Sequence, residues 1–169
     1  MPEEPFDAIG NQRVICLNAG VSDCNVCRFA TFDEDTTTLG ADDIDLRLFA
    51  VDNCTDFNVL GQIGGSGGAT SAEVIDVANA AAGGYAFIID YYAAASGTDI
   101  DYLAFIYFVL GDEGNASLMN VPASATAGSA VTETVNYSGL NSDSRYLGVV
   151  SHQDGGGEIA RTVIDIDTQ

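Results

Sequence analysis

The chain has 169 residues, which suffices for one large β domain or two small ones, and 47% of them are hydrophobic. It carries 25 acidic residues against 5 basic ones, all arginine, for a formal net charge of -20. A surface this acidic repels nucleic-acid phosphates and anionic lipid headgroups, so neither is expected as a partner. The longest apolar run, residues 102–110, is far shorter than the roughly 20 residues of a membrane helix, so no membrane insertion is expected.

The first residues, "MPEEPFDAIG", have neither the basic start nor the apolar stretch of a signal peptide. We interpret residues 1–12 as a linker. If the protein is secreted, we expect this chain to be part of a longer one.

From residue 13 onward, short apolar or alternating runs are separated by Gly, Asn, Asp and Ser, and helical periodicity is almost absent. This pattern predicts an all-β domain over residues 13–111. Its predicted strands are 13–19, 26–32, 44–51, 57–63, 72–78, 85–92 and 102–110.

For two of these strands, the sequence also predicts how they are buried. In "IDLRLFAV", residues 44–51, one face carries Ile44, Leu46, Leu48 and Ala50 and the other carries Asp45, Arg47 and Phe49. This alternation predicts a half-buried strand. "YLAFIYFVL", residues 102–110, is apolar on both faces and predicts a strand that is central in its sheet or sandwiched between layers.

"GDEGNAS", residues 111–117, is typical of a linker, and the sequence beyond it is rich in Ser and Thr. This part predicts a small β-sandwich of immunoglobulin-like or fibronectin-like type over residues 112–169. Its predicted strands are near 116–121, 129–137, 145–152 and 158–166.

The four cysteines are Cys16, Cys24, Cys27 and Cys54. "CNVC", residues 24–27, is not followed by the helix that a thioredoxin-type CxxC motif opens. A zinc site made of four cysteines normally has two CxxC motifs, and this chain has one. Two disulfides are the favoured interpretation over free or metal-bound thiols, and they predict a location outside the cytoplasm. If strands 26–32 and 44–51 form a hairpin, Cys24 comes close to Cys54, which leaves Cys16 to pair with Cys27.

The stretch "FDEDTTTLGADDIDLRLF", residues 32–49, carries acids near both ends of a predicted hairpin loop. Calcium takes six to eight oxygen ligands at flexible angles, so such a loop can supply several of them. The predicted ligands are Asp33, Asp35, Asp42, Asp43 and Asp45, with Glu34 or backbone carbonyls completing the shell. Asp99 and Asp101 form a weaker second candidate. A solvated acidic loop without a metal is the alternative.

Catalytic interpretations fit less well. Glycosidase acids face each other across a cleft, whereas these acids crowd into one loop. The single histidine, His152, is interpreted as an exposed turn residue, and no serine lies in a GxSxG motif. The glycine-rich "GQIGGSGGATSAE", residues 61–73, lacks the lysine of a phosphate loop and predicts a flexible β connection. The chain is therefore not expected to be an enzyme.

Three segments carry a family resemblance: "DDIDLRLF" at 42–49, "IGGSGGATSAE" at 63–73 and "NAAAGGYAFIIDYY" at 79–92. With them, residues 29–111 resemble the bacterial pre-peptidase C-terminal domain, a β jelly roll appended to secreted peptidases. "VPASATAGSAVTETVNYSGL" and "RYLGVVSHQDGGGEIARTVIDI" then resemble the small β segment that follows this jelly roll in some secreted bacterial subtilisin-like serine proteases. The resemblance covers most of the chain after residue 25.

The resemblance implies a secreted, non-catalytic C-terminal region of a subtilisin-like serine protease, whose N-terminal catalytic domain is the partner in the parent chain. It implies roles in stability, export or attachment to insoluble protein or polysaccharide substrates. It also implies calcium binding by the acids around the DDxDL pattern, which maps onto Asp42, Asp43 and Asp45, and less closely onto Asp33 and Asp35.

Two alternative functions remain open. The chain could be a module that binds collagen-like protein or polysaccharide through an aromatic patch of Tyr91, Tyr92 and Tyr102, although tyrosines on strands more often pack in a core. It could also be a fragment of a cell-surface adhesin that has no link to proteolysis.

Overall fold

The computed structural model describes residues 12–18, 24–38, 40–81, 83–95 and 100–169. The chain divides between Leu110 and Gly111 into two compact units, and each unit is described by itself. The N-terminal unit contains β1 (Gln12–Leu17), β2 (Val26–Thr31), the 3-10 turn η1 (Asp33–Asp35), β3 (Asp43–Val51), β4 (Val59–Ser66), β5 (Glu73–Ala78), β6 (Gly84–Ala93) and β7 (Phe105–Val109).

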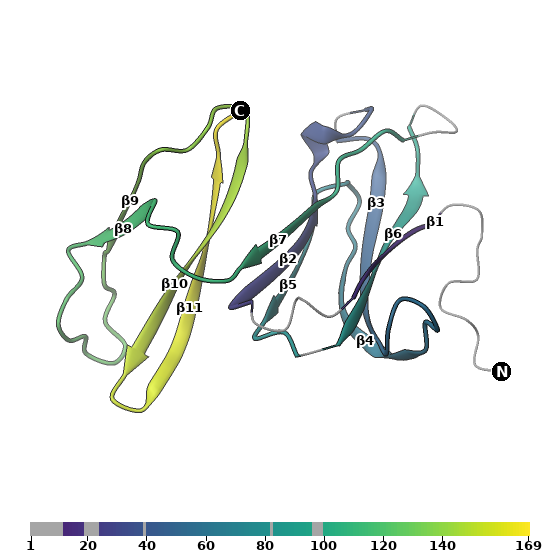
Figure 1. Ribbon diagram of the computed structural model, residues 1–169. Helices are drawn as coiled ribbons and strands as arrows, with labels where there is room; N and C mark the ends of the chain where they lie inside the picture. The colour runs from purple at the N-terminus through teal and green to yellow at the C-terminus, as the bar shows by residue number, and fades with distance from the viewer. Residues whose placement is uncertain (1–11, 19–23, 39, 82, 96–99) are drawn as a thin grey trace. The chain divides into compact units, whose positions relative to one another are not determined.

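The strands of this unit form two antiparallel sheets that pack as a sandwich (Figure 1). One sheet has the strand order β1-β6-β3-β4 and the other has the order β5-β2-β7. The predicted all-β sandwich is confirmed, and each predicted strand is present with its ends shifted by a few residues. Within the described ranges, no helix is long and apolar enough to cross a membrane.

The core between the sheets is built from the alternating faces of the strands. Ile44, Leu46 and Leu48 of β3 are all completely buried, which confirms the apolar face predicted there. Phe49 and Val51 on the opposite face are buried too, so β3 is not the half-buried strand expected. Phe29 of β2 and Phe87 of β6 meet across the core with their ring centroids 5.2 Å apart. Each such side chain contributes about 1.5–3 kcal/mol of burial free energy.

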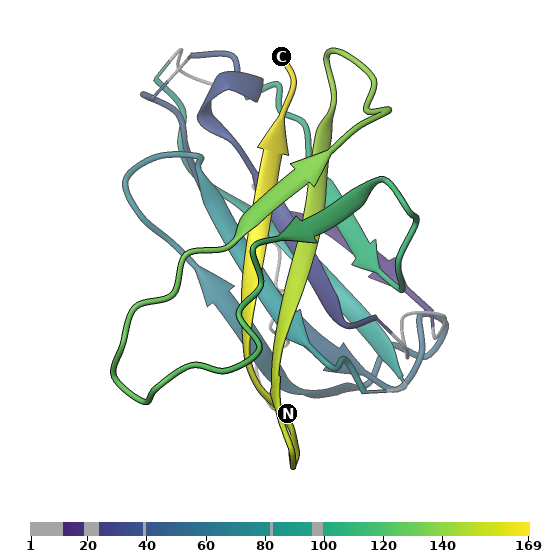
Figure 2. The ribbon, with the colours of Figure 1, turned by 90° about the vertical axis from the view of Figure 1, so that its left-hand side faces the viewer.

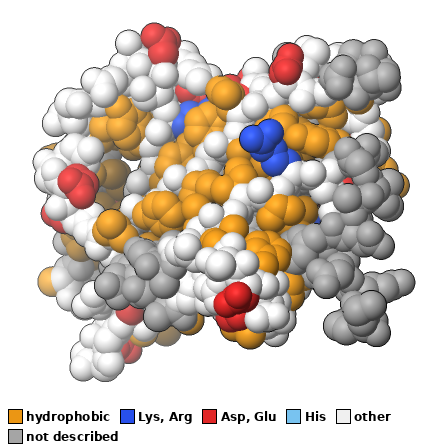
Figure 3. Space-filling model, turned by 45° about the vertical axis from the view of Figure 1, so that its right-hand side comes forward, with side chains coloured by type: hydrophobic (Ala, Val, Ile, Leu, Met, Phe, Trp, Pro, Cys, Tyr) orange, Lys and Arg blue, Asp and Glu red, His pale blue; other side chains and the backbone are white. Residues whose placement is uncertain are grey.

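The outer face of the four-stranded sheet carries a second apolar cluster. It includes Phe49 and Val51 of β3 together with Ala86 and Ile88 of β6, all buried. Figure 3 shows a broad apolar area on this side of the molecule, with acidic side chains toward its margins. The β3 and β6 strands are therefore packed on both faces.

The position of β7 differs from the sequence prediction. The apolar run 102–110 was expected to be central or sandwiched, but among the described strands β7 pairs with β2 alone and lies at the edge of its sheet. Its outward aromatic residues pack on each other instead: the rings of Phe105 and Tyr107 stack at 6.0 Å, and Phe32 contacts Phe105 edge-on at 5.4 Å. Aromatic self-packing accounts for the two-sided apolar pattern.

The connection between β2 and β3 crosses from one sheet to the other. The expected hairpin of strands 26–32 and 44–51 is therefore wrong, because β2 pairs with β5 and β7 while β3 pairs with β4 and β6. All six residues of β2 are buried, and such a strand needs a hydrogen-bonded neighbour on each edge and a packed layer on its faces.

Two disulfides are present as predicted, but the cysteines pair differently. Cys16 is bonded to Cys54 and Cys24 to Cys27, with Cα separations of 5.7 and 5.8 Å. The expected pairs were wrong because they depended on the hairpin that the fold does not form. In the four-stranded sheet, β6 lies between β1 and β3. The turn after β3 contacts the end of β1, where the Cys54 backbone amide donates to Asn18 Oδ1 at 2.8 Å. Cys54 is therefore close to Cys16 of β1. The two bonds favour an oxidising compartment.

The C-terminal unit consists of two hairpins. β8 (Ala116–Met119) pairs with β9 (Thr134–Tyr137). β10 (Arg145–Asp154) pairs with β11 (Gly157–Asp167), and these two strands form a long hairpin (Figure 2). No residue from 111 to 169 is fully buried. Since isolated two-stranded hairpins are marginally stable in water, this unit gains little from a core of its own. Its all-β character was predicted; an immunoglobulin-like type stays a prediction.

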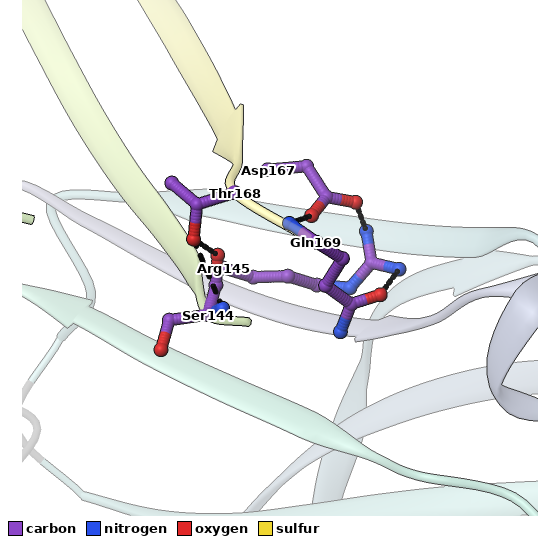
Figure 4. A network of polar contacts seen from close by, with 5 residues as sticks. All are labelled: Ser144, Arg145, Asp167, Thr168 and Gln169. Atoms are coloured by element: carbon purple, nitrogen blue, oxygen red, sulfur yellow. Dashed lines mark hydrogen bonds and ion pairs between the residues drawn. The ribbon is translucent and has the colours of Figure 1, made fainter. Parts of the chain in front are cut away.

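A polar network joins the open end of the β10–β11 hairpin (Figure 4). Arg145 Nη1 and Asp167 Oδ2 form an ion pair at 2.8 Å. The Ser144 amide donates to Thr168 Oγ1 at 3.0 Å, and the same hydroxyl donates to the Ser144 carbonyl at 2.8 Å. The backbone amide of Gln169 donates to Asp167 Oδ1 at 2.9 Å. These contacts hold the two strand ends together.

Candidate functional site

Asp42 is fully buried where the chain enters β3. Its two carboxylate oxygens accept hydrogen bonds from the backbone amides of Thr38 and Ala95, at 2.7 and 2.9 Å. Its carbonyl accepts from Ser71 Oγ at 3.0 Å. The Asp42 side chain therefore ties the segment before β3 to the segment after β6.

Asp33 and Asp35 lie in η1, directly after β2. Asp33 Oδ1 accepts from the Ser71 amide at 2.7 Å, and its carbonyl accepts from the Thr36 hydroxyl at 2.8 Å. Ser71 thus contacts both Asp33 and Asp42. The two ends of the acidic loop come together through a residue that precedes β5, not through a hairpin.

A group of carboxylates, called the acidic edge below, comprises Asp43 and Asp45 of β3 and Glu73 of β5. Asp43 Oδ1 is buried and has no hydrogen-bond partner. Burial, followed by the neighbouring Asp45, raises the pKa of Asp43. Burial, followed by Asp90 directly opposite on β6, raises the pKa of Asp45, and Arg47 opposes that shift. Like charges therefore face one another here.

Glu73 brings a carboxylate from the second sheet to this edge. Burial raises the pKa of Glu73, repulsion from Asp45 and Asp43 adds to the shift, and a hydrogen bond from Ser66 Oγ opposes it. The Ser66 hydroxyl also accepts from the Val74 amide at 3.2 Å. The carboxylate is thus held in place at the junction of β4 and β5.

The glycine-rich turn between β4 and β5 passes close to these carboxylates. A Cβ atom at Gly67 would lie 2.7 Å from Asp45 Oδ1, and one at Gly68 would lie 2.9 Å from Glu73 Oε1. A side chain at either position would require the neighbouring carboxylate to shift. Of the predicted β connection 61–73, residues 61–66 lie in β4, and only residues 67–72 connect β4 to β5.

The five aspartates predicted as calcium ligands have different surroundings. Asp33 and Asp42 accept hydrogen bonds from backbone amides, Asp35 ends the η1 turn, and Asp43 and Asp45 belong to the acidic edge. Across the described parts of the chain, no group of three or more Asp, Glu, His or Cys side chains is arranged to hold a metal ion. Sequence reasoning did not select Glu73, because a single acid far along the chain carries no local signal and only sheet packing brings it near β3.

In the absence of calcium, the acidic edge should make stability depend on pH. Folding raises the pKa of Asp43, Asp45 and Glu73, so the folded chain binds protons more tightly than the unfolded chain, and these carboxyls destabilise the fold above their raised pKa values. Asp45→Asn should raise the free energy of unfolding at pH 7 by about 0.2–1 kcal/mol, as expected for like charges facing across strands.

The gain from Asp45→Asn should shrink as the pH falls toward about 4, where ordinary carboxyls begin to be protonated. Urea unfolding of the wild type and the variant between these pH values measures both effects. Glu113→Gln, at an exposed position in the other unit, is the matched control. An Asp45→Asn variant that is less stable than the wild type at pH 7 would contradict the repulsion.

Two of the three predicted ligand-binding tyrosines come together. The Tyr91 and Tyr102 hydroxyls are 3.0 Å apart, and their rings meet edge-on at 5.6 Å. Tyr92 is 73% exposed and, as the next residue along β6, points away from Tyr91. Asp101 adjoins Tyr102, while Asp99 of the second acidic candidate lies outside the described residues.

His152 was predicted to be a turn residue, but it lies at a β-bulge in β10. Its Nε2 is 2.9 Å from the hydroxyl of Thr162 on β11. All four cysteines are disulfide-bonded, so no free thiol accompanies this histidine. That the chain is not an enzyme stays a prediction.

No family model matches this chain, and no curated protein or solved structure matches it.

Proposed function

We propose that the chain is a non-catalytic accessory region of a secreted subtilisin-like serine protease, which aids the stability, export or substrate attachment of that enzyme. The ordered resemblance of its motifs supports this proposal, together with its all-β architecture and its two disulfides. The catalytic domain would be encoded upstream of Met1 in the same reading frame. A frame that encodes no peptidase there would contradict the proposal.

Calcium is the proposed stabilising ligand, and the observation that carries this part is the buried, unpartnered Oδ1 of Asp43 within the acidic edge. A buried carboxylate oxygen without a hydrogen bond destabilises the fold, and the neighbouring like charges add to the penalty. A hard cation that binds oxygen would relieve both effects.

The proposed ligands are Asp43, Asp45 and Glu73, with backbone carbonyls supplying further oxygens. Asp42 and Asp33 are proposed to support the site by holding the adjoining loops, since their carboxylates already accept backbone amides. Because the described carboxylates do not form a three-ligand group, binding would have to draw them closer together.

Thermal and urea unfolding in calcium chloride and in chelator tests the calcium part directly. At about a hundred times the dissociation constant, calcium should stabilise the fold by roughly 2.7 kcal/mol. Asp43→Asn should lose most of this gain, whereas Glu113→Gln should keep it. Magnesium chloride serves as the ionic-strength control. An unfolding midpoint that is the same in calcium and in chelator would remove the metal from the proposal.

A further inference from the structure

A pocket of about 380 Å³ opens between the edge strand β1, the end of β6 and the segment that leads to β7. Arg13 and Ile15 of β1 line it together with Tyr91, Asp101 and Tyr102. This volume falls within the range of about 300–1,000 Å³ that small-ligand sites occupy. The residues that line the pocket include no member of the acidic edge and no cysteine.

Arg13 is the arginine of this pocket, and it forms no ion pair with any described residue. The other four arginines are each paired with an acid: Arg28 with Asp76, Arg47 with Asp90, Arg145 with Asp167 and Arg161 with Glu158. In a chain of net charge -20, an exposed guanidinium that faces a pocket offers its N–H donors to a ligand.

The pocket also contains a negatively charged residue, Asp101. The backbone of Asp101 is fixed by Thr37, whose hydroxyl accepts from the Asp101 amide at 2.6 Å. The Asp101 carboxylate is exposed and has no hydrogen bond or ion pair with the described residues, Arg13 included. An acceptor and a donor of opposite charge therefore line one pocket without contacting each other.

The tyrosine pair provides the wall and a third polar group. One of the two hydroxyls donates to the other, which leaves one O–H proton without an acceptor among the described residues. Burial, followed by the hydrogen bond with Tyr91, raises the pKa of Tyr102, which keeps its hydroxyl in the protonated form. The partly buried rings also offer apolar surface beside the polar groups.

We propose that this pocket binds a neutral carbohydrate, with one sugar residue seated between Arg13, Asp101 and the Tyr91–Tyr102 pair. A sugar hydroxyl both donates and accepts, so neighbouring hydroxyls can accept from Arg13 and donate to Asp101. The C–H face of the ring would pack on the tyrosines, as apolar surface does on aromatic rings. This inference rests on the substrate attachment in the proposed function and gives it a ligand class and a pocket. Binding here requires neither calcium nor the protease domain, so the two proposals can fail separately.

A zwitterion such as a peptide end is the competing chemistry. Its two charges would have to be desolvated for exposed partners, and exposed ion pairs contribute only about 0–1 kcal/mol each. A sugar ring also packs its C–H face on the two tyrosine rings, which buries apolar surface in addition to forming hydrogen bonds. The balance favours the neutral ligand.

Saturation-transfer NMR and calorimetry with chitotetraose, cellotetraose and mannotetraose test the proposal on the full, disulfide-bonded chain. At least one of these sugars should bind, in chelator as well as in calcium, which separates this test from that of the metal. Tyr102→Phe and Arg13→Gln should each weaken binding about tenfold, the effect of one lost strong hydrogen bond.

Tyr92→Phe and Arg161→Gln are the matched controls and should bind as the wild type does. Circular dichroism shows whether each variant folds; if Arg13→Gln does not, Tyr102→Phe, which removes a single hydroxyl, decides the matter. The proposal is overturned if none of the three sugars binds, or if binding survives the pocket variants. Binding of glycyl-leucine without binding of any sugar would also overturn it.

Discussion

Removing the disulfide between Cys16 and Cys54 by the double substitution Cys16→Ser, Cys54→Ser is expected to lower the free energy of unfolding by roughly 4 kcal/mol. The bond closes a loop with a sequence separation of 38 and anchors the edge strand β1 to the end of β3. Its loss frees the unfolded chain, which gains conformational entropy. Urea unfolding of the oxidised chains, followed by circular dichroism, measures the difference.

The second disulfide provides the control. Cys24 and Cys27 are separated by only 3 in sequence, so the same reasoning gives roughly 2 kcal/mol for the pair Cys24→Ser, Cys27→Ser. If this pair costs as much as the removal of Cys16–Cys54, loop closure does not explain the stability of the unit. The packing of the buried Cys24 and Cys27 side chains would then contribute more than loop closure does.

Asp42→Ala is expected to destabilise the N-terminal unit by about 2–4 kcal/mol, because two backbone amides lose a charged acceptor. Those amides, of Thr38 and Ala95, fix the entry of β3 and the exit of β6. The loss should be the same in calcium and in chelator, since both carboxylate oxygens are engaged within the protein. Urea unfolding under the two conditions measures it.

Asp42→Asn is the informative companion variant, because it keeps one oxygen acceptor and nearly the same shape. It should recover part of the stability that Asp42→Ala loses. A destabilisation of Asp42→Ala that appears only in calcium would contradict the structural role and would make Asp42 a metal ligand, as the sequence resemblance implies.

The acidic residues show how far sequence reasoning can reach at the candidate site. The cluster of acids at 33–45 was visible as a pattern, but the pattern did not separate Asp42, which holds loops, from Asp43, which has a buried oxygen without a partner. That distinction depends on Ala95 and Glu73, which the chain supplies from distant segments. Gly67 and Gly68 likewise indicate only a flexible turn until the carboxylates beside them are known.

The tyrosines give a similar result. A strand pattern places Tyr91 and Tyr92 on opposite faces, and it was the segment after residue 100 that decided which of them meets Tyr102. No sequence signature shows that Arg13 lacks an ion pair with the described residues, because ion pairing depends on which acids lie within reach in space. The pocket could therefore be found only in three dimensions.

By itself, the sequence determined the all-β class, the approximate extents of the strands, the buried face of β3 and the presence of two disulfides. These properties depend on local alternation of apolar and polar residues, on turn-forming residues and on cysteine content. Only the tertiary structure decided the sheet to which each strand belongs, the Cys16–Cys54 and Cys24–Cys27 pairing, and the neighbours of each acid. Pairing between strands is a competition among contacts distant in sequence, and the residues along one strand do not record its outcome.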